Sequence, residues 1–452
     1  MKAALEKIRN IWSAVDIRKK LLFTAMILLI YRIGCAIPVP YVDSSVVESF
    51  EQAFGTTIFS LMNIMSGGAM GQATFFALGI SPYITAQIVV QLLTVAIPKW
   101  QEMSKDDDGK KWLEGFTRVF TIILAVVTAL AYYFILKNQG WLIKPEREWV
   151  QALIIVSVFT AGAALIMWLG EKINEHGIGN GISMILFVNI LSQIPSIIGS
   201  MINLFTYDKV YFGIPFGILS FVVAIFMVLF VVFVTNSERR IPVQYAQRVV
   251  GRKVYGGHKT NLPIKLNMTG VMPIIFASSI VSLPSTIVAL AGKANDTKGW
   301  GYWVNEILGP SSLVYVALFI ILIVAFSYFY ILISFDPVEV SNNLKNNGGA
   351  VPGIRPGDAT AEYIKKILKR ITFIGAIFLA IVAGFPLFVS SLAALLSNFD
   401  VTTNFFGAQV LSGLQSLTFG GSSLLILISV ALETYRVIEA QMSMRHYKGF
   451  FQ

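Results

Sequence analysis

The amino-acid sequence predicts an all-α polytopic membrane protein with ten transmembrane helices in two pseudo-symmetric, inverted halves of five helices. Three observations predict this fold class: the apolar composition, the number of long apolar runs, and a motif that occurs once in each half. Hydrophobic residues make up 55% of the chain and charged residues 13%, whereas soluble domains carry about 25% charged residues. A chain dispersed in lipid has no need to hide that much apolar surface in a core.

Ten runs are long enough to span a bilayer, which takes roughly 20 mostly apolar residues. They are residues 21–39, 73–97, 119–136, 150–169, 178–198, 213–235, 268–290, 313–335, 371–396 and 419–437. Five runs fall in an N-terminal half, residues 1–205, and five in a C-terminal half, residues 206–452. Residues 2–12 alternate apolar and basic positions at helical spacing, which predicts an amphipathic helix on the membrane surface.

Basic residues indicate the orientation of these spans, because cytoplasmic loops are enriched in Lys and Arg. With the N-terminus in the cytoplasm, most of the 35 Lys and Arg residues fall on cytoplasmic segments. The outer loops then hold only Lys137, Lys144, Arg147, Lys209, Lys293 and Lys298. We therefore expect both termini in the cytoplasm.

A short motif is repeated between the halves. Residues 79–86 read Gly-Ile-Ser-Pro-Tyr-Ile-Thr-Ala, and residues 270–277 read Gly-Val-Met-Pro-Ile-Ile-Phe-Ala. Each copy opens an apolar run, and a repeat with an odd number of spans must be inverted in the membrane. Interrupted segments at matching positions of two such halves point to the functional site. Coincidence is the alternative, because glycine, proline and isoleucine are common in spans.

The predicted membrane interior is nearly free of ionisable residues. Arg32 lies near the outer end of the first span, and Glu171 and Glu433 lie at cytoplasmic ends. Ion-coupled transporters generally place such residues at mid-depth. A passive conduit whose energy comes from outside the chain therefore fits better than the alternative, a secondary transporter for a small solute.

No pattern in the chain indicates an enzyme, a metal site or a cofactor. Cys35 is the only cysteine, and His176, His258 and His446 lack metal-ligand spacing. Residues 177–181, Gly-Ile-Gly-Asn-Gly, resemble a phosphate loop but join two apolar runs instead of a strand and a helix. We expect these glycines to turn the chain and cap a span. A membrane-embedded enzyme is the least favoured class.

Two cytoplasmic loops are longer than topology requires. They are residues 236–267, which are rich in Lys and Arg, and residues 336–370, which hold a Pro- and Gly-rich stretch at 346–357. A docking surface explains their charge and their length together. Phosphates of RNA can bind the basic cluster, and Arg355 can pair with a carboxylate of a protein partner. The candidate docking residues are Arg240, Arg248, Arg252, Lys253 and Arg355.

Five segments in order along the chain resemble the SecY family of bacterial protein-export channels. They are residues 76–84, 177–183, 267–273, 351–357 and 419–426. Ser422 departs from the threonine expected there, and the outer loop at 398–417 is longer than usual. The resemblance covers essentially the whole chain. It implies a channel in the inner (cytoplasmic) membrane that passes unfolded secretory polypeptides and releases membrane segments laterally into lipid.

The resemblance also implies roles for particular residues. An hourglass pore would narrow at a ring of aliphatic side chains, formed by Ile80, Ile84, Ile182, Leu186, Ile275 and Ile426. Residues 54–69 would form a plug, with Phe59, Met62, Ile64, Met65, Gly67 and Gly68 as its candidate residues. Spans 73–97 and 268–290 would line a lateral gate, with Gln91, Asn267, Pro82 and Pro273. An apolar constriction can block ions and water by dewetting, without any charge.

The implied partners are SecE and SecG, which would pack against the chain, and the SecA motor ATPase or the ribosome, which would bind the basic loops. Signal-sequence-bearing polypeptides would be the substrates, and membrane lipid would surround the bundle. The resemblance implies no cofactor.

Overall fold

Helices dominate this computed structural model, which describes residues 9, 12–43, 62–63, 65–143, 147–206, 210–245, 247–250, 253–256, 259–290, 299–309, 312–397 and 421–448. The first half contains α2 (Val15–Gly34), α5 (Ser81–Ala96), α6 (Pro98–Met103), α7 (Asp107–Asn138), α8 (Glu148–His176) and α9 (Gly181–Thr206). The second half contains α10 (Val210–Asn236), α11 (Met272–Leu290), α12 (Trp300–Leu308), α13 (Leu313–Ser334), α14 (Pro337–Asn346), α15 (Asp358–Ser397) and α18 (Gly421–Lys448). Of the predicted surface helix 2–12, only residues 9 and 12 are described.

Each of the ten apolar runs in the sequence overlaps one of these helices. Within the described residues, four helical stretches are long and apolar enough to cross a membrane: Asp107–Asn138, Glu148–His176, Leu313–Asn346 and Asp358–Val389. Shorter apolar helical segments are Ser81–Ala96, Gly181–Ser196, Phe221–Asn236 and Met272–Val281. The expectation of a mostly helical, apolar protein is confirmed in this form.

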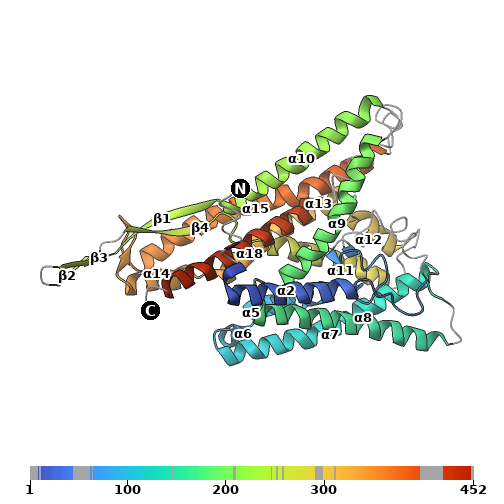
Figure 1. The fold of residues 1–452 in the computed structure, drawn as a ribbon, viewed down its shortest axis with the longest axis horizontal. Coiled ribbons are helices and arrows are strands. Elements are labelled where there is room, and N and C mark those ends of the chain that lie inside the picture. Colours follow the sequence, from blue (N-terminus) through green and yellow to red (C-terminus); the bar gives the residue numbers. More distant parts are fainter. Residues whose placement is uncertain are drawn as a thin grey trace.

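Helix packing follows the same pattern in the two halves. In the first half, α5 packs on α7, α7 on α8, α8 on α9, and α2 on both α8 and α9. In the second half, α11 packs on α13, α13 on α15, α15 on α18, and α10 on both α15 and α18. The halves meet where α9 contacts α10 and α18, and where α11 contacts α5 and α7. Figure 1 shows α2, α5, α7 and α8 below, with α10, α15 and α18 above.

Residues 236–267 are not an irregular loop, and the prediction of an all-α chain was wrong for this segment. Strand β1 (Glu238–Tyr245) pairs antiparallel with β4 (Lys259–Lys265) and, at its end, with β5 (Gly349–Ala350). Strands β2 (Gln247–Val250) and β3 (Lys253–Gly256) form an antiparallel pair between them. Together these strands extend past the helix ends as an arm at the left of Figure 1.

The sequence of β1 explains why this segment is extended. Along β1, Ile241 and Val243 are buried, while Arg240, Pro242 and Gln244 are exposed. This alternation has the period of two that is typical of a strand with one buried face. The sequence-based interpretation of this segment considered only its charge and length, and so it missed this alternation.

The two long loops form one packed unit, which we call the loop module: β1, β4, β5, α14 and the first turns of α15. Its buried side chains pack with Ile331 of α13 in a cluster separate from the main core: Ile241, Ile264, Ile331, Val351, Ile364, Leu368 and Ile371. The Ser341 hydroxyl donates a hydrogen bond to the carbonyl oxygen of Gly357 at 2.7 Å, which ties α14 to the start of α15. The residues from 336 to 370 are therefore mostly ordered structure and not a long loop.

Candidate functional site

The six predicted ring residues come from both halves of the molecule. Ile80 precedes α5 and Ile84 lies in its first turn, while Ile182 and Leu186 are one turn apart on α9. Ile275 belongs to α11 and Ile426 to α18. All six side chains are between 1% and 7% exposed, and all belong to the same cluster of packed apolar side chains.

This arrangement limits the chemistry of the site. Every member of the predicted ring is a branched aliphatic side chain, with no hydrogen-bonding or ionisable group. Such a contact can exclude water and ions by dewetting, but it cannot perform acid–base, nucleophilic or metal chemistry. Among the described residues, no three His, Cys, Asp or Glu side chains are grouped so that they could hold a metal ion.

The repeated motif has the same backbone geometry in both of its copies. Gly79 has φ of +58° and Gly270 has φ of +62°, and each lies two residues before the start of its helix. Positive φ is accessible to glycine with little cost. Pro82 and Pro273 are both buried, and each is the second residue of its helix, where a missing N–H costs nothing. The repeated motif therefore has matching backbone conformations in the two halves as well as matching residues.

The two predicted polar gate residues carry buried atoms without partners. The Gln91 Oε1 and Asn267 Nδ2 atoms have no hydrogen-bond partner within the described residues. The Thr269 hydroxyl bonds Asn267 Oδ1 at 3.3 Å. A Cβ atom on Gly375 of α15 would lie 4.0 Å from the Asn267 Cα atom. Asn267 is therefore next to α15, and no contact between it and Gln91 is described.

Part of the predicted plug lies within the described residues. Met62, Met65, Gly67 and Gly68 are described, whereas Phe59 and Ile64 lie outside the described residues. Met62 and Met65 pack against the main core, and both glycines have positive φ.

Side chains of α2 and α9 hold the end of this segment by its backbone. Asn189 Nδ2 donates to the carbonyl oxygen of Met65 at 2.7 Å. Arg32 Nη1 and the Ser192 hydroxyl reach the carbonyl oxygen of Gly67 at 3.4 and 3.5 Å. Sequence reasoning did not assign these three residues to the plug. The available signal was Arg32, a charged residue inside a predicted span.

The glycine-rich segment 177–181 is a tight turn between α8 and α9, as predicted. Asn180 Oδ1 accepts hydrogen bonds from the backbone N–H groups of Ile182 and Ser183 at 3.0 and 3.3 Å, and so caps α9. A Cβ atom on Gly181 would lie 2.0 Å from the carbonyl oxygen of Gly170 on α8. The close approach of the two helices therefore requires glycine at this position.

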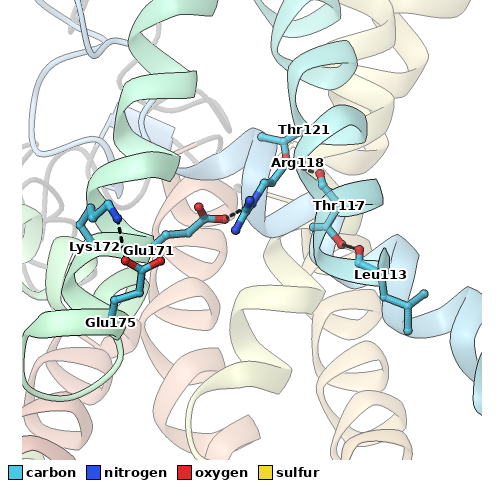
Figure 2. Close-up of polar contacts among 7 residues, drawn as sticks. All are labelled: Leu113, Thr117, Arg118, Thr121, Glu171, Lys172 and Glu175. Carbon is cyan, nitrogen blue, oxygen red and sulfur yellow. Dashed lines mark hydrogen bonds and ion pairs between the residues drawn. The ribbon is translucent and has the colours of Figure 1, made fainter. Parts of the chain in front are cut away.

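An ion pair that sequence reasoning did not predict joins α7 to α8. Arg118 Nε donates to Glu171 Oε1 at 2.7 Å (Figure 2). This hydrogen bond raises the pKa of Arg118 above its ordinary value. Because the Arg118 side chain is about half exposed, solvent screens the pair, and pairs of this kind contribute ~0–1 kcal/mol.

Other polar side chains near this pair have their partners on their own helix. On α7, the buried hydroxyls of Thr117 and Thr121 donate to carbonyl oxygens one turn earlier, at 2.8 and 2.7 Å, so they need no other partner (Figure 2). On α8, Lys172 Nζ lies 2.6 Å from Glu175 Oε2. This contact lowers the pKa of the exposed Glu175 carboxyl.

The predicted docking residues are distributed over the arm and the loop module. Arg240, on β1, pairs with Glu238 at 2.8 Å. Arg248 is on β2 and Lys253 is on β3, so both belong to the outer hairpin of the arm. Arg355 is exposed on the turn between β5 and α15. Arg252 lies outside the described residues.

Known proteins resemble this chain along nearly its whole length. A family model described as SecY matches residues 74–435. The protein translocase subunit SecY of Streptomyces scabiei is 40% identical over 449 residues, covering 97% of each chain. The SecY subunit of Mycobacterium tuberculosis is 40% identical over 454 residues, covering 97% of this chain and 98% of that one.

Solved structures show the same fold at lower identity. A structure described as a protein-conducting channel has a TM-score of 0.62 and 20% identity, covering 94% of this chain and 92% of its own. Sec61 in a canine ribosome–channel complex has a TM-score of 0.58 and 18% identity, with the same coverage. The fold and the sequence matches agree, and the chain belongs to the SecY family.

Proposed function

We propose that this protein is the channel subunit of a protein translocase, which passes unfolded secretory polypeptides across the cytoplasmic membrane. The same channel releases membrane-protein segments sideways into lipid. The observation that carries the proposal is the burial of Ile80, Ile84, Ile182, Leu186, Ile275 and Ile426 in one cluster that joins both halves. Aliphatic side chains seal against ions without charge, and they can move apart for a chain of any sequence.

The proposed architecture has ten spanning helices, in halves that comprise residues 1–205 and 206–452. Its support is the matching helix packing of the two halves and the matching glycine and proline geometry before α5 and α11. An inverted repeat places equivalent helices of the two halves around a common site. Both termini face the cytoplasm in this proposal, since the basic arm and the loop module then lie on the cytoplasmic side.

The gate is proposed from the contacts between the halves, and the plug from the hydrogen bonds that hold the carbonyls of Met65 and Gly67. Helix α11 contacts α5 and α7 across one junction, and the buried Gln91 Oε1 atom of α5 has no partner among the described residues. An unsatisfied buried polar atom costs roughly 1–3 kcal/mol, and in this proposal a movement of α5 at the junction gives the Gln91 amide a partner. The plug comprises residues 54–69.

Energy for transport comes from partners in this proposal, because the chain has no described catalytic cluster. The exposed Arg355 and the basic hairpin of the arm form a docking surface for the SecA motor ATPase or the ribosome. SecE and SecG pack against the lipid-facing sides of the bundle. A secondary transporter for a small solute, the alternative weighed from the sequence, is not supported by the comparisons.

A crosslinking experiment tests the channel. A photoreactive residue at Ile84 or Ile275 should react with a secretory chain stalled during transport through the complete translocase. The same residue at Ile30 of α2, which is 44% exposed and faces lipid in this proposal, is the matched control and should not react. Absence of crosslinks from both pore positions, in a complex that still transports, would refute the channel site.

A further inference from the structure

Arg32 lies near the outer end of the predicted span 21–39, among mostly apolar residues. Its side chain is half-buried near the C-terminal end of α2. Among the residues that the structure describes it forms no ion pair, and its described side-chain partner is the carbonyl oxygen of Gly67, 3.4 Å from Nη1. A charged side chain that bonds a backbone carbonyl at the end of a span is a candidate for a function.

Gly67 fits tightly between Arg32 and a second polar side chain. A Cβ atom on Gly67 would lie 2.9 Å from Arg32 Nη1 and 2.7 Å from Asn189 Oδ1. Both polar atoms thus lie within 3 Å of the same point. The φ of Gly67 is +70°, which favours glycine, so the segment presents its bare backbone to the two side chains.

Asn189 is fully buried on α9 and uses only one end of its amide. Its Nδ2 atom donates to the carbonyl oxygen of Met65 at 2.7 Å. Its Oδ1 atom has no partner within the described part of the chain. An unused buried acceptor therefore lies beside a guanidinium that has donors to spare.

We propose that Arg32 is a two-position latch for the plug, an inference that rests on the proposed function. With the channel closed, Arg32 holds the Gly67 carbonyl while Asn189 holds the Met65 carbonyl. When the plug leaves, both carbonyls leave with it, and Arg32 turns to Asn189 Oδ1. The new charge-assisted hydrogen bond partly offsets the two that are lost. The free-energy difference between the two positions is therefore small enough for an arriving substrate to reverse it.

Resting ion leak through the complete translocase in lipid vesicles measures the closed position. Arg32→Ala should raise this leak about tenfold, because a hydrogen bond from a charged donor is lost. Arg32→Lys should retain most of the seal, since its ammonium still donates. Arg18→Ala removes the same charge from the other end of α2 and should leave the leak unchanged.

Variants at Asn189 separate a latch from simple packing. Asn189→Asp removes the donor to Met65 and attracts Arg32 away from Gly67, so it should leak more than Asn189→Leu. In the Arg32→Ala background that excess should disappear. Equal leaks for the two Asn189 variants, or an excess that persists without Arg32, would overturn the latch.

Hydrogen–deuterium exchange distinguishes release from misfolding. Arg32→Ala should speed exchange in residues 65–80 and leave the peptides of α8 unchanged. Faster exchange throughout, or no change in residues 65–80, would count against the proposal. If wild-type vesicles fail to open for a secretory substrate, the proposed function itself fails. If they open normally and Arg32→Ala seals as well as wild type, only the latch fails.

Discussion

At the scale of single residues, glycines set how closely other parts of the chain approach the helices around the site. A Cβ atom on Gly34 of α2 would lie 2.1 Å from Phe76 Cε2, and one on Gly162 of α8 would lie 2.1 Å from the carbonyl oxygen of Phe75. Phe75 and Phe76 belong to the turn that leads to Ile80. The position of this ring candidate therefore depends on two glycines in other helices.

Gly162→Ala should destabilise the protein, because the new methyl group meets a backbone carbonyl that cannot rotate away. Overpacking of this kind costs about 1–3 kcal/mol, which we expect to see as a lower thermal midpoint in detergent. Gly115→Ala is the matched control, since Gly115 is also inside a helix and has nothing within 4 Å of the added atom. It should leave the midpoint unchanged or raise it slightly. A normal midpoint for Gly162→Ala would contradict this account of the turn.

The six aliphatic ring candidates are all buried, and both their convergence on one axis and their role in gating stay predictions. The involvement of Arg32 and Asn189 could not be predicted in the same way. Their partners are backbone carbonyls of Gly67 and Met65, and every residue carries such a carbonyl. Side-chain identity in the sequence does not show which one a distant polar group will reach.

At the scale of elements, the strands of the arm form for the same reason as the helices. In both, apolar side chains recur at a fixed spacing and pack together on one buried face. Ile241 of β1 and Ile264 of β4 pack with Ile364 and Leu368 of α15. The strands therefore have a core of their own, apart from the membrane-facing bundle. This packing fixes the position of the turn between β5 and α15, which carries the exposed Arg355.

Arg355→Glu should weaken partner-driven transport while the protein still inserts and folds. Loss of a contact from a charged donor reduces partner affinity about tenfold or more, and the new carboxylate would repel an acidic partner. Lys345→Glu changes the charge equally at an exposed residue of α14 and should have little effect. Transport assays with the purified motor or with ribosomes measure the difference. Equal activity of the two variants would argue against docking at Arg355.

At the scale of the whole molecule, two bundles with the same internal packing meet along two junctions, α9 with α10 and α18, and α11 with α5 and α7. The candidate ring lies in the core that they share. A seal made between two bodies can open when they move relative to one another, without unfolding either one. The ring candidates carry no charge, so in the proposed channel closure depends on apolar contact.

Ile84→Asn should therefore raise the resting ion leak of the reconstituted translocase, because an amide in the ring binds water and prevents dewetting. We expect a leak increase of about tenfold or more, with substrate transport retained. Ile84→Leu conserves volume and apolarity, and it should stay sealed. A tight Ile84→Asn channel would show that the seal lies elsewhere.

The sequence by itself determined the membrane-protein class, the approximate positions of the helices that overlap its apolar runs, the glycine turn at 177–181 and the repeated glycine–proline motif. These follow from local properties: the length of an apolar run, the period of a pattern and the φ angles that a residue tolerates. Only the tertiary structure decided that the two loops form one module, that Asn267 lies beside α15, and that Arg32 and Asn189 bond the backbone carbonyls of Gly67 and Met65. Those contacts join residues far apart in the chain, and several involve backbone atoms, which no side-chain pattern encodes.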